Sequence, residues 1–177
     1  MRITGGSLCG RRVQAPPGAI RPAMDRMRES IFAALGDISG LSFLDIFSGS
    51  GIIALEAASR GASCIEAVEM DPVKRKTLLE NVKISPVRVN CRFMSAELYI
   101  KRAKKGFDVI FCDPHFPYRY RYALISSIAA SPIMNHGSRL LLHRPREDSG
   151  LSNEKLTLED TREYGRSFVD FFKFVST

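Results

Sequence analysis

The sequence lacks the long apolar run that a membrane span needs, because no uninterrupted apolar stretch approaches roughly 18 residues. Residues 1–6 end in two glycines, and Arg11 and Arg12 follow where a secretory signal peptide would carry its apolar stretch. The chain also has no internal repeat and no low-complexity tract. We therefore expect a cytoplasmic protein with no membrane partner.

Motifs for metal binding and for disulfide scaffolds are also absent. The four cysteines are Cys9, Cys64, Cys91 and Cys112, and no two of them form a C-x-x-C pair. Three of them lie in apolar, strand-like runs, where a reduced thiol packs as a small apolar group. His136 and His143 do not stand at a metal-ligand spacing. We expect free thiols in a reducing compartment and no metal site.

Positive charge is what the sequence has in excess. The 177 residues carry 26 Lys and Arg against 19 Asp and Glu, which gives a net charge of +7. The excess is concentrated in residues 1–35 and 101–122. Because a basic surface attracts polyanions, nucleic acid is the expected partner. The hydrophobic share of 45% is that of an ordinary globular protein, and the length suits one domain.

From residue 41 onward, short apolar runs alternate with amphipathic segments of helix length, which is typical of βαβ units and a parallel sheet. Strands are expected over residues 42–46, 64–69, 87–93, 107–112 and 139–143, with helices over 51–60, 71–83, 95–104 and 120–130. Residues 155–164 and 167–175 alternate on either side of Gly165 and predict an antiparallel hairpin. We expect an α/β fold with a mixed seven-stranded sheet, antiparallel C-terminal strands and helices on both faces.

Two segments precede this pattern. Residues 22–35 carry apolar or small residues at helical spacing and are followed by Gly36, which predicts a helix. Residues 1–20 are rich in glycine and proline and predict an extended basic arm that is not packed into the fold. We therefore divide the chain into an arm, residues 1–20, and one domain, residues 21–177.

The first candidate site lies in residues 44–54, where a strand runs into a glycine turn and then into a helix. Gly49 and Gly51 let the backbone bend sharply and approach a ligand, and the helix N-terminus offers N–H groups to an anion. Glu69 ends the following strand, where a carboxylate can accept both ribose hydroxyls of a nucleotide. This arrangement predicts a nucleotide-containing cofactor.

Asp45 distinguishes between two such cofactors. Gly49-x-Gly51-x-x-Ala54 also satisfies the dinucleotide fingerprint, which is a weak signal by itself. The pyrophosphate of a dinucleotide gains nothing from a nearby carboxylate, whereas S-adenosylmethionine (SAM) carries an ammonium and a sulfonium. An acid at this strand end therefore favours SAM, and a nicotinamide-dependent oxidoreductase remains an alternative.

The second candidate site follows the strand at residues 107–112. It consists of Asp113, Pro114, His115 and Phe116. In an open α/β sheet, ligands bind beyond the carboxyl ends of the strands, so Asp113 and Asp45 should face the same crevice.

Together these residues resemble the class I SAM-dependent methyltransferases that act on exocyclic amines, whose motif is Asn or Asp, Pro, Pro, and then Tyr or Phe. More specifically, the sequence resembles the bacterial family that methylates guanine N2 in 16S ribosomal RNA, over almost the whole chain. The matching segments are residues 2–6 and 10–12 of the basic arm, 21–32 of the first helix, 44–51, 68–71 and 164–165.

The resemblance implies a Rossmann-like class I methyltransferase fold, SAM as the cofactor and 16S ribosomal RNA as the partner of what we expect to be a monomer. The implied catalytic residues are Asp113, Pro114 and Phe116. The implied cofactor-binding residues are Asp45, Phe47, Gly49, Ser50, Gly51, Glu69, Met70, Ser95, Ala96 and Asp113. The implied RNA-binding residues are Arg11, Arg12, Arg21 and Arg26.

The sequence departs from the family pattern at two positions. Ser95 stands before Ala96 where the family usually has Asp, in position to take the adenine amino group, and a hydroxyl accepts a hydrogen bond more weakly than a carboxylate. His115 replaces the second proline of the catalytic motif, where it either shapes the motif or contacts RNA. Two further alternatives follow: amine methylation of adenine N6 or cytosine N4, and an RNA-binding protein with a degenerate SAM pocket.

Overall fold

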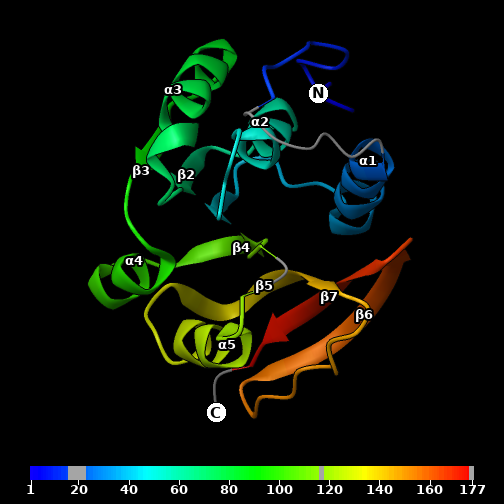
Figure 1. Ribbon diagram of the computed structural model, residues 1–177, viewed down its shortest axis with the longest axis vertical. Coiled ribbons are helices and arrows are strands. Elements are labelled where there is room, and N and C mark those ends of the chain that lie inside the picture. The colour runs from blue at the N-terminus through cyan, green and yellow to red at the C-terminus, as the bar shows by residue number, and fades with distance from the viewer. Residues whose placement is uncertain (16–22, 116–117, 176–177) are drawn as a thin grey trace.

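The computed structural model describes residues 1–15, 23–115 and 118–175. Its strands are β1 (Ser42–Ile46), β2 (Cys64–Val68), β3 (Val89–Arg92), β4 (Phe107–Cys112), β5 (Met134–Pro145), β6 (Leu156–Tyr164) and β7 (Ser167–Phe174). They form one sheet in the order β3-β2-β1-β4-β5-β7-β6 (Figure 1). The first five strands in this order are parallel, and β7 is antiparallel to both its neighbours. This topology confirms the predicted fold class.

Helices cover both faces of the sheet (Figure 1). They are α1 (Ala23–Leu35), α2 (Ile52–Ser59), α3 (Pro72–Asn81), α4 (Ala96–Arg102) and α5 (Arg121–Ala129), with a 3-10 turn, η1, at Val82–Ile84. Side chains of α1, α2 and α3 share one hydrophobic core, and those of α4 and α5 share the other. None of the described helices is long and apolar enough to cross a membrane.

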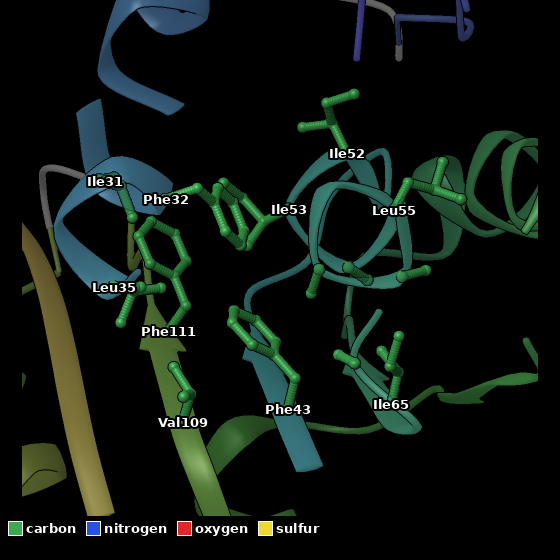
Figure 2. Close-up of a cluster of buried hydrophobic side chains, with 14 of the residues drawn as sticks. Ile31, Phe32, Leu35, Phe43, Ile52, Ile53, Leu55, Ile65, Val109 and Phe111 are labelled. Carbon is green, nitrogen blue, oxygen red and sulfur yellow. The ribbon is translucent and has the colours of Figure 1, made fainter. Parts of the chain in front are cut away.

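Alternate residues of β1 point to opposite sides of the sheet and therefore into the two cores. Phe43 packs with residues of α1 and α2, and the next residue, Leu44, packs with residues of α4 and α5. In the first core the ring of Phe32 stacks on Phe43 with 6.0 Å between centroids, and Phe111 of β4 lies beside them (Figure 2). Because β1 is buried on both faces, its carboxyl end is held firmly between its neighbours.

The first 15 residues are packed against the domain, so the expectation of an unpacked arm is wrong. Ile3 is fully buried in the core. The backbone of Arg2 pairs with that of Arg12, which folds the segment back on itself. The backbone N–H of Ser7 then donates to the carbonyl of Ser59 at the end of α2, at 2.7 Å. Glycines make this close approach possible: a Cβ on Gly6 would lie 1.9 Å from the same carbonyl oxygen.

The fifth strand is longer than predicted and begins at Met134, not at Arg139. The residues at its start do not alternate between buried and exposed, since Asn135, His136 and Gly137 are all exposed. The pairing of β4 with β5 also shifts register between Phe107 and Val109. The apolar pattern therefore marks only the regular half of the strand.

Candidate active site

Three carboxylates meet at the carboxyl edge of the sheet. The last residue of β1 pairs with the last residues of β2 and β4, so the three strands end side by side. Asp45 lies one residue before the end of β1, and Glu69 and Asp113 directly follow β2 and β4. The structure therefore brings the three predicted acids to the same edge of the sheet.

Asp45 is 1% exposed and accepts two hydrogen bonds on Oδ2. The Ser48 hydroxyl donates at 2.5 Å, and the backbone N–H of Ala54 in the first turn of α2 donates at 3.2 Å. Burial raises the pKa of Asp45 to about 7, and the charges of Asp113 and Glu69 add to this rise, while the two hydrogen bonds oppose it. A cation beside a buried carboxyl group with a raised pKa stabilises the ionised form of that group.

Glu69 ties the glycine turn to the end of β2. Its Oε2 accepts from the backbone N–H of Gly49 at 2.7 Å, and its Oε1 accepts from that of Asp71 at 2.8 Å. The carboxylate is buried, but each oxygen keeps a second lone pair. Met70, the next residue in the chain, is 64% exposed.

The glycine turn has a left-handed backbone at three positions. Gly49 and Gly51 have φ values of 58° and 80°, and Phe47 adopts 67° although it carries a side chain. A Cβ on Gly51 would lie 2.6 Å from the Leu78 side chain, so this position requires glycine for space as well as for φ. Ser50 is buried, and its carbonyl accepts from the Asn81 amide at 2.9 Å. Gly51 is thus the N-cap residue of α2, and no side chain at this position bonds to the first N–H groups of the helix.

Asp113 is held by a histidine that the sequence pattern did not assign to the site. The Nδ1 of His143 lies 2.7 Å from Asp113 Oδ1. His143 is 4% exposed and belongs to β5, where its predecessor, Leu142, pairs with Cys112. The ladder therefore places His143 beside Asp113, while Pro114 is buried next to them. Only this strand register could have revealed the contact, because the two residues lie far apart in the sequence.

Aromatic rings extend the site beyond Asp113. The Tyr118 ring packs edge-on against Phe47, with 5.6 Å between centroids, and against His115, at 5.7 Å. Its hydroxyl donates to Glu97 of α4. Phe116, the predicted ring of the catalytic motif, lies outside the described residues. Tyr118 and Glu97 were not predicted as site residues, although the aromatic run after Asp113 was visible.

Ser95 begins α4, as predicted. Its hydroxyl accepts the backbone N–H of Leu98 at 3.2 Å and so caps the helix. Ala96 is buried in the first turn. The serine therefore has a structural use in the protein, and its oxygen is shared between the helix cap and any ligand.

The predicted RNA-binding arginines are exposed where the structure describes them. Arg11, Arg12 and Arg26 are all on the surface, and Arg21 lies outside the described residues. The neighbouring Arg28 is fully buried instead and bonds to Glu56 of α2. No group of three or more potential metal ligands occurs among the residues that the structure describes, and all four cysteines are free thiols.

Comparisons with known proteins place the chain in a family and match its fold. The family model described as conserved hypothetical protein 95 matches residues 1–173. Ribosomal RNA small subunit methyltransferase D of Escherichia coli strain K12 is 36% identical over 121 residues, which cover 66% of this chain and 60% of that protein. The protein of the same name from Haemophilus influenzae is 27% identical over 169 residues, 89% of this chain and 86% of that one. The solved structure of the Escherichia coli protein yhhF has a TM-score of 0.87 at 25% identity and covers 100% of this chain and 99% of that chain.

Proposed function

Since this chain belongs to the family of SAM-dependent methyltransferases that includes ribosomal RNA small subunit methyltransferase D, we propose that it transfers a methyl group from SAM to the exocyclic N2 amine of a guanine in 16S ribosomal RNA. The observation that carries this proposal is the meeting of Asp45, Glu69 and Asp113 at one edge of a protein whose net charge is +7. A negative site on a basic protein suits a cationic cofactor and a polyanionic substrate together.

The residues at this edge fit SAM. Asp45 is buried near two other carboxylates, which is a costly arrangement that a cationic ligand relieves. Glu69 has lone pairs for ribose hydroxyls, and the N-terminus of α2 favours the carboxylate of the amino acid portion. When bound, SAM supplies an electrophilic methyl group.

The protein's contribution to the transfer is mainly the positioning of the amine. A guanine amino group is a weak nucleophile because its lone pair is delocalised into the ring. The Asp113 carboxylate accepts one of its N–H groups and the carbonyl of Pro114 accepts the other, which leaves one face of the nitrogen open. His143 donates to Asp113 Oδ1, so that Oδ2 is available to the amine. These acceptors also stabilise the positive charge that develops on the nitrogen.

The choice of small-subunit ribosomal RNA is supported by the names of the relatives and by the net charge of +7, and guanine N2 is what the family resemblance implies. To reach Asp113, the target base must leave its stack, as recognition of unpaired RNA generally requires. Phe116 is the ring that the family resemblance assigns to stacking on this base.

Two matched variants test the proposal. Asp113→Ala should abolish methyl transfer and leave SAM affinity within a few-fold, because its partner is the nucleobase. Glu69→Ala should weaken SAM binding by about 10- to 150-fold, the equivalent of roughly 1.5–3 kcal/mol for a hydrogen bond to a charged group. Isothermal titration with SAM and transfer of labelled methyl groups measure the two effects. Turnover by the Asp113 variant, or unchanged affinity in the Glu69 variant, would contradict the assignments.

The substrate is tested by mapping modified nucleosides in ribosomal RNA from a strain that lacks the gene. One guanine that carries N2-methyl in the parent should be unmodified in the deletion strain, and the purified protein should restore the mark. Loss of an N6-methyladenine or an N4-methylcytosine would instead show that a different amine is methylated.

A further inference from the structure

Several exposed apolar side chains belong to segments that follow the carboxyl ends of β2 and β4. Among the described residues, the exposed large hydrophobic side chains are Met70, Val73, Leu79, Tyr120, Tyr122 and Leu158. Met70 and Val73 follow the carboxyl end of β2, and Tyr120 and Tyr122 follow that of β4. Scattered exposed residues need no explanation, whereas an exposed ring that packs on the residues of a polar site marks a contact surface.

Tyr120 is the most exposed of these side chains, at 71%. Its ring packs edge-on against Tyr118, with 6.2 Å between centroids and 81° between the planes. Tyr118 is itself braced by Phe47 and by its hydrogen bond to Glu97. Tyr120 is therefore supported at one side, while most of its surface remains open to a ligand.

One exposed cation stands next to this ring in the chain. Arg119 directly precedes Tyr120 and is exposed, and the protein as a whole carries a net charge of +7. An open aromatic ring beside a cationic side chain is a combination that binds unpaired nucleotides, since the ring stacks on a base and the cation attracts a phosphate. An apolar protein partner would leave the charge of Arg119 without a complement.

We infer that Tyr120 stacks on an unpaired base next to the target nucleotide. This inference rests on the proposed function for the identity of the RNA and adds a requirement to it: the RNA is single-stranded on at least one side of the methylated base. Tyr120 then acts as a specificity-determining residue, because a duplex, whose bases are already stacked, offers it nothing to bind.

The experiment measures binding of a fluorescein-labelled oligoadenylate of about 12 nucleotides, a length within the range that single-strand binding domains cover. Tyr120→Ala should weaken binding by about 5- to 150-fold, whereas Tyr120→Phe should bind within about twofold of the natural protein. The salt dependence should not change, because stacking releases no counterions. Leu158→Ala, which shortens an exposed apolar side chain of β6, is the matched control and should have no effect.

Three outcomes overturn the inference: full affinity in Tyr120→Ala, an equal loss in Tyr120→Phe, or an equal loss with a double-stranded RNA of the same length. A second variant keeps the test independent of affinity. The protein has no tryptophan, so Tyr120→Trp introduces a single one, whose fluorescence should be quenched by the oligonucleotide if a base stacks on it.

The two proposals fail in different ways. If no RNA accepts a methyl group but Tyr120→Ala still weakens single-strand binding, the proposed function is wrong and the stacking site stands. If methyl transfer occurs and the tryptophan is not quenched, only the stacking site is wrong.

Discussion

Arg28 and Glu56 form an ion pair in which neither side chain is exposed, with 3.1 Å between Nε and Oε1. The same glutamate accepts from the Thr4 backbone at 2.8 Å and from the Arg60 guanidinium. Arg28 also donates to the carbonyl of Arg2 at 2.8 Å. This cluster joins the N-terminal segment, α1 and α2, the helix that begins at the glycine turn.

Glu56→Gln should therefore lower the free energy of unfolding by about 3 kcal/mol, because it removes the buried carboxylate that pairs with both Arg28 and Arg60 and leaves the fully buried Arg28 with Asp25 as its counterion. Urea denaturation measures this loss. The control is Glu80→Gln, whose partner Lys83 is exposed, and it should cost no more than about 1 kcal/mol. Similar losses in the two variants would show that the buried pair has no special importance.

The raised pKa of Asp45, about 7, predicts how the ligand-free protein responds to pH. Its pKa in the unfolded chain is about 3.9, so between these values the unfolded state releases a proton that the folded state keeps. The contribution of Asp45 to stability is thus complete below about pH 4 and is lost as pH rises through about 7. Asp45→Asn removes this dependence, so the unfolding free energy of the natural protein should fall relative to the variant between pH 5 and 8 on urea denaturation. Parallel profiles for the two proteins would contradict the assigned pKa.

His143→Leu should lower kcat for methyl transfer by about 10- to 150-fold, the effect of losing roughly 1.5–3 kcal/mol of hydrogen bonding to Asp113, and leave SAM affinity within a few-fold. His143→Asn places an amide N–H near the position of Nδ1 and should recover part of the rate. His143→Gln places it near Nε2 and should not. If glutamine restores the rate as well as asparagine, the role of His143 is packing and not orientation of Asp113.

The N-terminal arginines should contribute to RNA affinity through phosphates alone. Replacing Arg11 and Arg12 with Ala should weaken binding of any RNA and reduce the magnitude of the salt slope by about 0.7 to 0.9 for each lost phosphate contact, without changing SAM affinity. Binding measured at several salt concentrations gives the slope. Arg88→Ala, at an exposed arginine before β3, is the control. An unaltered slope in the double variant would mean that the RNA backbone binds elsewhere, along residues 101–121.

The sequence was sufficient to predict the sheet and the three carboxylates, because both follow from local patterns. Asp45 lies near the end of an apolar run, Glu69 and Asp113 directly follow one, and parallel strands place such ends together. The contact of His143 with Asp113 depends on strand register, which the apolar pattern of β5 does not specify. The packing of residues 1–15 was also missed, since it depends on hydrogen bonds from a glycine-rich backbone to Ser59 and Glu56. Glycine in a sequence indicates only that the backbone is conformationally free, not what it packs against.

The outer strands of the sheet bear on how the protein behaves at high concentration. β3 has only four residues, and β6 has a register break between Leu158 and Asp160, with both of its acids there, Glu159 and Asp160, exposed. A straight, apolar edge would present its N–H and C=O groups to a neighbouring molecule and allow the sheet to continue into it. Among the described strands neither edge has that form. Contacts between copies must therefore use side chains, and partly folded chains have little opportunity to extend the native sheet into an aggregate.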